Sequence, residues 1–439
     1  MKFIVDNLQL VNHAEIVLDG VTVIAAPNGS GKSTISKGLA SLASLCRDVS
    51  VNVQYRRFEK IIETVRHVYS GMGVDIVLYD DVRELPMEPL TALFSPRFWD
   101  DPENFRKWFV TYFSREADMR SPMGFVYPRD FFPERKHEPR YDQLKEEVLA
   151  VLSVSDVQLA KEESRSFMDW VFDGDWASRD YEDQSTRLSI GSGGEETYVE
   201  LQNKHINKGS QLGTQFFTSV FHVEPYHAID MNRRMLRSSW RSSPLSVLKG
   251  IARCCEWPRT CAIRKEDVLA RLAGIARGRI KDTKSGLVYE ETFADGKIRK
   301  INPHGIASGM KPLAELAWAI EKGAVLPSGL LIIDEPETNL HPEWQVQFAD
   351  FLVWFSVKCD VKLVLNTHSP YFLRAVDVAS RREKCAPNCH YYRMVKCPDG
   401  YRMQTDCVDG NLDELFAEMH RPFARLREEV PVVRDVERD

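Results

Sequence analysis

The chain reads Ala26-Pro27-Asn28-Gly29-Ser30-Gly31-Lys32-Ser33-Thr34 directly after the apolar run Val21–Ala25. This order predicts a strand, a glycine-rich loop that cradles phosphates, and a helix. The glycines let backbone N–H groups turn inward around an anion, Lys32 reaches the β- and γ-phosphate oxygens, and the hydroxyl of Ser33 is a ligand for Mg²⁺. Ala26 stands where the motif usually has its first glycine. The stretch therefore predicts a nucleoside triphosphate site, with a chance surface loop rich in Gly and Ser as the alternative.

A second motif lies far downstream. It reads Leu330-Leu331-Ile332-Ile333-Asp334-Glu335-Pro336-Glu337-Thr338-Asn339-Leu340-His341-Pro342. The four apolar residues are typical of a strand buried on both faces of a parallel sheet, whose carboxyl end is where ligands of open α/β sheets bind. Asp334 is predicted to hold Mg²⁺ through water, and Glu335 to act as general base for the attacking water.

A third apolar run, residues 361–365, ends in Asn366-Thr367-His368-Ser369-Pro370. Because two nucleotide motifs precede it, His368 is predicted to be the γ-phosphate sensor. A histidine that only belongs to a capped turn is the alternative.

Between these motifs, Ser308 and Gly309 open a helix whose apolar residues Leu313, Leu316 and Ile320 recur at helical spacing. The free N–H groups at such a helix start form a seat for an anion. A simple N-cap is the alternative interpretation.

The order of these motifs resembles the ABC-type ATPases of the SMC/Rad50/OLD branch. More narrowly, it is similar to the AAA-15/AAA-21-type ATPases of bacterial anti-phage systems such as Septu and PARIS. The resemblance implies ATP and Mg²⁺ as cofactors, and a dimer or higher oligomer in which Ser308 and Gly309 of one subunit close on ATP held by Lys32 of another. It also implies that Asn339 and His341 lie in a D-loop at the dimer interface. Gln54 and Gln202 both remain candidates for the glutamine loop.

We therefore predict an α/β fold: an ABC-type P-loop ATPase head with a mostly parallel sheet flanked by helices, an antiparallel β subdomain, a helical lobe and a helical insertion. The predicted parts are the start of the nucleotide-binding lobe (1–80), an aromatic insertion (81–185), return strands (186–230), a basic helical lobe (231–307), and the signature helix, Walker B strand, histidine switch and end of the lobe (308–439). The aromatic residues of the insertion could stack bases, but we favour the core of a small helical subdomain.

Composition favours a soluble, cytoplasmic protein without a membrane anchor. The chain has 439 residues, 43% of them hydrophobic, and no apolar stretch near the ~20 residues that a membrane span needs. Its nine cysteines are an odd number and indicate reduced thiols. A zinc cluster of Cys385, Cys389, His390 and Cys397 is a less favoured alternative because the ligand spacing is poor.

Charge is distributed unevenly along the chain. The net charge is −6, yet residues 231–284 contain fourteen Lys and Arg against four Asp and Glu. This segment could contact phosphates of DNA or RNA. The alternatives are a solvated helical face and a contact with an acidic neighbouring subunit.

The chain beyond His368 is short. It predicts a strand pair, 390–395 and 401–405, that turns at Pro398-Asp399-Gly400, and then a helix from Leu412 to about Arg427. This leaves no room for the nuclease domain that follows the ATPase in OLD-type proteins, so no nuclease activity is expected in this chain.

We therefore predict an ATPase of phage defence that controls a separately encoded effector, an HNH-type nuclease or another toxin, through ATP-dependent engagement of its heads. The second interpretation is a DNA-repair ATPase similar to Rad50 or RecF that acts on DNA ends or gaps. A transporter subunit is less favoured because no Leu-Ser-Gly-Gly-Gln run is present.

Overall fold

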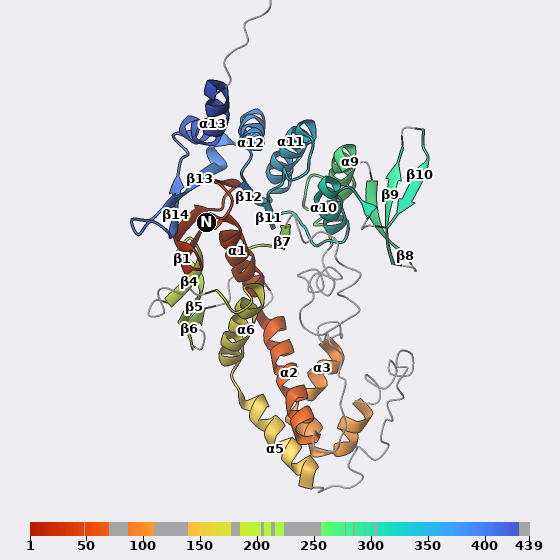
Figure 1. Cartoon of the computed structure of the whole chain (residues 1–439). Coiled ribbons are helices and arrows are strands. Elements are labelled where there is room, and N and C mark those ends of the chain that lie inside the picture. The colour runs from red at the N-terminus through yellow and green to blue at the C-terminus, as the bar shows by residue number, and fades with distance from the viewer. Residues whose placement is uncertain are drawn as a thin grey trace, which may run out of the picture. The chain divides into compact units, whose positions relative to one another are not determined.

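The chain divides into two compact units (Figure 1). The computed structural model describes residues 1–47, 49–69, 87–108, 139–176, 185–202, 206–211, 216–223, 256–276, 278–283, 286–293, 295–302 and 305–429. The first unit contains residues 1–47, 168–231 and 252–439, and the second contains 48–167 and 232–251. The predicted boundary at residue 80 therefore differs from the observed division.

The first unit is built on an eleven-stranded sheet. Its strands are β1 (Lys2–Leu8), β2 (Val11–Val17), β3 (Val21–Ala25), β4 (Ser185–Ser192), β5 (Glu195–Gln202), β6 (Ile206–Gln211), β7 (Val220–Val223), β11 (Leu330–Asp334), β12 (Lys362–Thr367), β13 (Cys389–Lys396) and β14 (Met403–Cys407). Their order is β6-β5-β4-β1-β2-β14-β13-β3-β12-β11-β7. The strands from β13 to β7 pair in parallel, and those from β6 to β2 pair antiparallel. The predicted α/β fold with a parallel sheet and an antiparallel β subdomain is confirmed.

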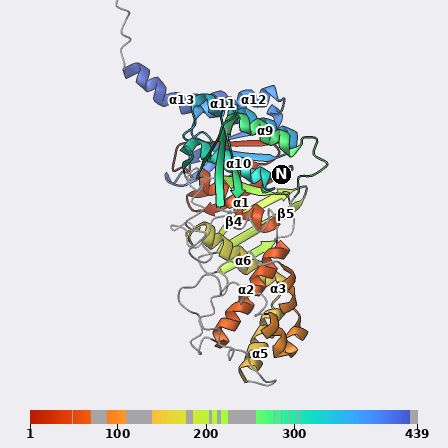
Figure 2. The same ribbon diagram turned by 90° about the vertical axis from the view of Figure 1, so that its right-hand side faces the viewer.

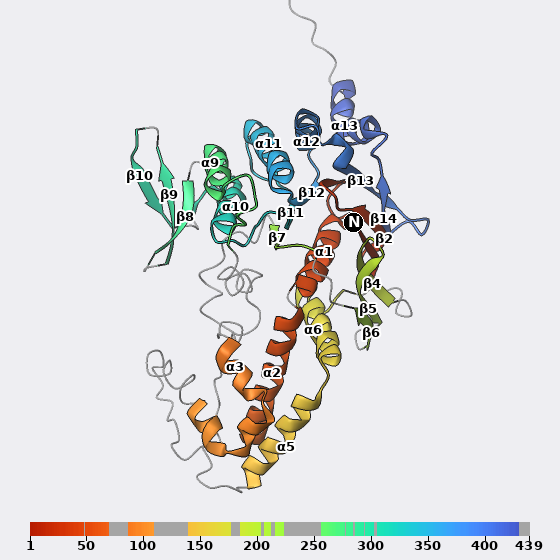
Figure 3. The same cartoon turned by 180° about the vertical axis from the view of Figure 1, so that it is seen from behind.

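Helices cover both faces of the parallel strands. Helix α1 (Lys32–Arg47) lies on one face, and α11 (Pro342–Cys359) and α12 (Pro370–Arg382) lie on the other (Figure 1, Figure 3). Every residue of β3 and β11 is buried, which explains why both strands are almost continuously apolar. In β11 the polar residue, Asp334, stands at the carboxyl end.

The lobe that was predicted to be helical also contains strands. Helices α9 (Lys265–Ala276) and α10 (Lys311–Glu321) lie beside a three-stranded antiparallel sheet of β8 (Gly278–Thr283), β9 (Gly286–Thr292) and β10 (Ile298–Ile301). Ile280 and Tyr289 of this sheet are buried. Because β-branched and aromatic residues fit a half-buried pleated surface, this segment forms strands despite its many charges.

The described part of the second unit consists of helices. Its helices are α2 (Val49–Tyr69), α3 (Met87–Leu93), the short 3₁₀ helix η3 (Pro96–Asp100), α5 (Pro139–Ser153) and most of α6 (Asp156–Val171). Helices α2 and α5 pack side by side (Figure 2). Their shared core buries Phe58, Trp99, Phe105, Trp108 and Tyr141. These aromatic residues therefore form a core, as favoured over base stacking. Two further aromatic residues of the insertion, Phe109 and Phe113, lie outside the described residues.

The end of the described chain follows prediction. Strands β13 and β14 form the expected antiparallel pair, and α13 (Leu412–Glu429) is the expected last helix. No helix in the described ranges is long and apolar enough to cross a membrane.

The candidate zinc residues do not converge on one point. The sulfur atoms of Cys385 and Cys389 lie 3.8 Å apart. Both ring nitrogens of His390 instead face carboxylates, Asp19 at 2.8 Å and Asp409 at 2.7 Å. Among the described residues no group of His, Cys, Asp and Glu is arranged to hold a metal ion, and the described cysteines are free thiols.

Candidate nucleotide-binding site

Strand register brings the three predicted motifs to one edge of the sheet. Ala25 of β3 pairs with Thr367 of β12, and Asn366 of β12 pairs with Asp334 of β11. Because these strands are parallel, the phosphate loop, the Asp-Glu pair and His368 all follow carboxyl ends that lie next to one another. Motifs that are distant in the sequence therefore form a single site.

The phosphate loop connects β3 to α1. Gly29 and Gly31 have φ angles of +75° and +92°, in the left-handed region where glycine is favoured. Helix α1 begins at Lys32, so its first N–H groups lie at the end of this loop. The remaining predicted loop residues are Asn28, Ser30, Ser33 and Thr34, of which Asn28 and Ser33 are exposed and Ser30 is buried.

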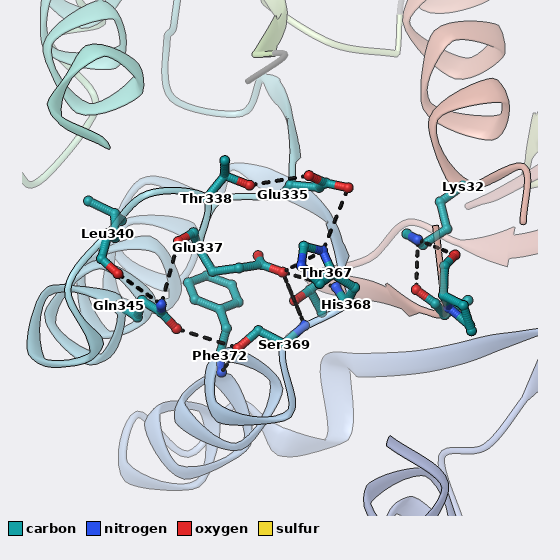
Figure 4. Close-up of polar contacts among 12 residues, drawn as sticks. Lys32, Glu335, Glu337, Thr338, Leu340, Gln345, Thr367, His368, Ser369 and Phe372 are labelled. Atoms are coloured by element: carbon teal, nitrogen blue, oxygen red, sulfur yellow. Dashed lines mark hydrogen bonds and ion pairs between the residues drawn. The ribbon is translucent and has the colours of Figure 1, made fainter. Parts of the chain in front are cut away.

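Lys32 is held inside the loop. Its Nζ donates to the carbonyl oxygens of Ala26 at 2.7 Å and Pro27 at 2.8 Å (Figure 4). Burial lowers the pKa of the Lys32 amine below its usual value. The negative charges of Glu335, Glu337 and Asp334 oppose this shift. The lysine thus faces both carbonyl oxygens and the acidic end of β11, and both attractions keep it at the phosphate loop.

Asp334 is contacted from both neighbouring strands. Its Oδ1 accepts a hydrogen bond from Asn366 Nδ2 at 2.6 Å, and its Oδ2 lies 3.4 Å from His222 Nε2. Burial raises the pKa of Asp334. The hydrogen bond and charge of His222, with hydrogen bonds from Ser33 and Ser36, outweigh that effect, so the pKa is lowered overall. The carboxylate is therefore ionised and oriented before any ligand arrives.

Glu335 adopts an unusual backbone conformation. Its φ is +48°, a region that costs free energy for a residue with a side chain. Its N–H donates to the carbonyl of Asn366 at 2.8 Å, and Oε2 accepts from Thr338 Oγ1 at 3.2 Å. Oε1 lies 3.6 Å from Nδ1 of His368 (Figure 4). The predicted base and the predicted sensor are thus in contact.

The predicted signature residues lie in a short 3₁₀ helix, η6 (Ser308–Met310), just before α10. Ser308 is exposed and Gly309 is buried. A Cβ on Gly309 would lie 2.2 Å from the carbonyl oxygen of Asn339, and Asn339 itself has a φ of +59°. The turn of Ser308 and Gly309 (the predicted signature turn) therefore lies against residues 336–341 (the predicted D-loop) of its own chain, and only glycine permits this approach.

Four site residues were not assigned a role from the sequence: His222, Ser36, Asn366 and Glu337. Asn366 and Glu337 stand inside the quoted motifs, which is the signal that could have identified them. His222 gave no such signal, because its role depends on the pairing of β7 with β11. Of the candidates for the glutamine loop, Gln202 ends β5, near the opposite edge of the sheet from β11, and Gln54 belongs to the second unit.

The described part of the basic segment is largely engaged within the chain. Arg264 forms an ion pair with Asp267 at 2.9 Å, and Lys265 Nζ donates to the carbonyl of Glu321 at 3.3 Å. The guanidinium of Arg271 lies 4.4 Å from the ring centroid of Trp354. The arginines between 233 and 253 lie outside the described residues, so nucleic-acid contact stays a prediction.

A parallel sheet whose adjacent strands deliver a phosphate loop, a buried aspartate followed by a half-buried glutamate, and a histidine defines an ABC-type P-loop ATPase head. The chain belongs to the AAA_21 family, described as "AAA domain, putative AbiEii toxin, Type IV TA system", which matches residues 21–374. The predicted resemblance to AAA-21-type ATPases is thereby confirmed.

Solved structures of SMC heads are among those that this chain matches. The SMC head domain from Thermotoga maritima is 12% identical, with a TM-score of 0.34 over 93% of this chain and 98% of that one. An Smc head bound to the C-winged helix domain of ScpA is 12% identical, with a TM-score of 0.38 over 94% and 98%. An Smc head with an extended coiled coil, bound to the C-terminal domain of ScpA derived from Pyrococcus furiosus, is 11% identical, with a TM-score of 0.33 over 96% and 98%. No curated protein sequence matches this chain.

Proposed function

We propose that this chain binds ATP with Mg²⁺ and hydrolyses it at Glu335, and that ATP joins its head to that of a second copy. The observation that carries the proposal is the register of β3, β12 and β11, which places Lys32, Asp334 and His368 at one edge of the sheet. Each residue type suits one part of a triphosphate site.

The residues fit a magnesium ion. Asp334 is a buried carboxylate with a lowered pKa, and Ser33, an exposed residue at the start of α1, makes a side-chain hydrogen bond to it. Oxygen ligands of this kind are what Mg²⁺ prefers, together with phosphate oxygens and water. When bound, the ion would neutralise charge on the β- and γ-phosphates. Asn366 and His222 would keep Asp334 oriented toward it.

The other residues would then act as follows. Lys32 would exchange its two carbonyl partners for β- and γ-phosphate oxygens, which are stronger acceptors. Glu335, held by Thr338, would orient the attacking water and accept its proton. His368 would contact the γ-phosphate from the end of β12. These roles agree with the contacts of each side chain.

The signature turn and the D-loop support engagement between two heads. Ser308 is exposed, and its neighbour Gly309 lies on Asn339, so both elements would meet a second copy as one surface. If ATP binds the closed pair of heads and not the open one, it shifts the population toward the closed pair. The size of the shift is set by the difference between its affinities for the two states. Hydrolysis would reopen the pair.

The biological role that we propose is control of a separately encoded effector, an HNH-type nuclease or another toxin, in a cytoplasmic anti-phage system. The description of the family as "AAA domain, putative AbiEii toxin, Type IV TA system" supports a partnered role of this kind. The second candidate is a DNA-repair ATPase related to Rad50 or RecF, which the positive charge of residues 231–284 favours. Copurification distinguishes them: a small effector protein supports the first, and binding to DNA ends without an effector supports the second.

Glu335→Gln tests the reaction. We expect hydrolysis to fall by about 10²–10⁴-fold while ATP still binds, because the amide cannot accept the proton. With ATP and Mg²⁺, the variant should have the mass of a dimer or larger assembly by light scattering, and the wild type should return to the smaller form after hydrolysis. Glu343→Gln, an exposed carboxylate at the start of α11, is the control. Normal turnover by Glu335→Gln would exclude Glu335 as the base.

A further inference from the structure

Glu337 is a buried carboxylate to which none of the roles above is assigned. Its side chain is 4% exposed. Its Oε1 accepts three hydrogen bonds, from Thr367 Oγ1 at 2.7 Å, from the N–H of His368 at 2.9 Å and from the N–H of Ser369 at 3.1 Å (Figure 4). Burying a charge is costly unless it is hydrogen-bonded, and here all three donors come from the loop that carries the predicted phosphate sensor.

The same oxygen also faces the ring of His368. Nδ1 of His368 lies 3.3 Å from Oε1 of Glu337 and 3.6 Å from Oε1 of Glu335. An ionised carboxylate can only accept, so the ring nitrogen that faces it carries the hydrogen. Two carboxylates thus favour a hydrogen on Nδ1, and Nε2 is the nitrogen that would meet the γ-phosphate.

A glutamine joins the same two loops a second time. Gln345 Nε2 donates to the carbonyl of Leu340 at 3.0 Å, and Gln345 Oε1 accepts from Ser369 Oγ at 3.4 Å (Figure 4). The D-loop and the loop 366–369 are therefore connected through Glu337 at one point and through Gln345 at another. A displacement of one loop would move the other.

We propose that Glu337 is the positioning residue for His368: its carboxylate fixes the ring with Nδ1–H turned toward it and links the γ-phosphate sensor to the D-loop. The inference rests on the proposed function, and it gives that function a route by which contact between two heads reaches the sensor.

Hydrogen bonding to the backbone alone does not require a charge at residue 337. An amide oxygen can accept the same three bonds. The carboxylate keeps a buried Oε2 that has no hydrogen-bond partner among the described residues, an arrangement that costs stability. The negative charge therefore serves something other than the backbone of the loop. It attracts the Lys32 amine, and the ring of His368 is the group that lies within ion-pair distance of it.

Glu337→Gln separates charge from hydrogen bonding. We expect kcat for ATP hydrolysis to fall by about 10–100-fold, the size typical of residues that orient a reacting group. KM for ATP and the melting temperature should change little, because the three acceptor contacts remain. In a His368→Ala background the same substitution should have no further effect on kcat, because Glu337 acts through the ring. Glu343→Gln, exposed at the start of α11, should match the wild type in both backgrounds.

The tautomer of His368 provides a readout that does not depend on hydrolysis. In protein labelled with ¹⁵N-histidine, the signals absent from His368→Ala identify this ring, and we expect its Nδ1 to carry a hydrogen in the wild type but to lose that preference in Glu337→Gln. A neutral ring with its hydrogen on Nε2 in the wild type would overturn the inference, as would an unchanged kcat in Glu337→Gln or an equal loss in the His368→Ala background. A wild-type chain that does not bind ATP would instead refute the proposed function, and the tautomer would still decide the role of Glu337.

Discussion

Two buried clusters of the molecule differ in chemistry. At the carboxyl edge of the sheet the first unit buries polar and charged side chains, namely Lys32, Asp334, Glu337, Asn366 and Thr367. The interior of the second unit is built on packed aromatic rings such as Trp99, Phe105 and Trp108. Buried polar groups cost free energy unless they are paired, whereas buried aromatic rings supply it. The comparison indicates that the first interior is retained for chemistry and the second for stability.

Pairing explains how the polar interior is tolerated. Asp334 and Asn366 are adjacent in register and bonded at 2.6 Å, and Glu337 accepts three donors from the next loop. The groups come from different segments of the chain, so each pair forms only when the sheet is assembled. Substitutions there should affect activity more than stability, and substitutions in the aromatic interior should do the reverse.

The largest effect is expected for Lys32→Ala. Removing the amine takes away the charge that meets the β- and γ-phosphates, so ATP affinity should fall by about 100-fold or more and hydrolysis should be lost. The melting temperature should change little. The pKa of the buried amine is lowered, which means that burial of its charge costs free energy, and this cost offsets what its hydrogen bonds contribute to folding. Calorimetric titration with ATP measures the loss, and Lys358→Ala, exposed on α11, is the control. Retained affinity would show that the polar interior is not the phosphate site.

Trp99→Ala should produce the opposite result. Trp99 is fully buried, and its Nε1 donates to the carbonyl of Leu93 at 2.9 Å. Deleting such a ring costs about 3–5 kcal/mol, so the second unit should unfold at a lower denaturant concentration. ATP affinity should stay within a few-fold of the wild type, because the phosphate-site residues named above belong to the first unit. Val157→Ala, at an exposed position, controls for the loss of an apolar side chain.

Gly309→Ala tests the contact between the signature turn and the D-loop. The added methyl group would meet the backbone of Asn339 at 2.2 Å, so one of the two segments must move, at a cost typical of overpacking. We expect hydrolysis to fall by about 10–100-fold with ATP binding to the isolated chain preserved. Gly305→Ala is the matched control, because a Cβ there meets no atom within 4 Å. Equal activity of both variants would show that the close approach is not required.

Local sequence was sufficient to predict the positions of the phosphate loop, the Asp-Glu pair and His368. In each case an apolar strand and the turn that follows it are continuous in the chain, so the residues that define each motif are neighbours in sequence. The same is true of the hairpin of β13 and β14, whose turn residues lie between the two strands.

What could not be predicted depends on which strands become neighbours. His222 contacts Asp334 only because β7 pairs with β11, although the two residues are far apart in the sequence. Glu337 reaches Thr367 because β11 pairs with β12. The sheet of β8 to β10 was missed for a different reason: the prediction assigns residues 231–307 to a helical lobe, and it does not use the alternation that buries Tyr289.

The smallest of these effects is expected for Asn366→Ala, within the polar interior itself. Its amide donates to Asp334 Oδ1 at 2.6 Å and to Ser36 Oγ at 2.7 Å. Losing both should lower the free energy of unfolding by about 1–2 kcal/mol, since Asp334 keeps other partners. Hydrolysis should nevertheless fall by more than that stability loss explains, because Asp334 is no longer held from the β12 side. Chemical denaturation and single-turnover hydrolysis, with the exposed Asn388→Ala as control, measure the two quantities. A variant that loses stability but keeps full activity would show that Asn366, like the aromatic residues of the second unit, serves the stability of the fold and not the reaction.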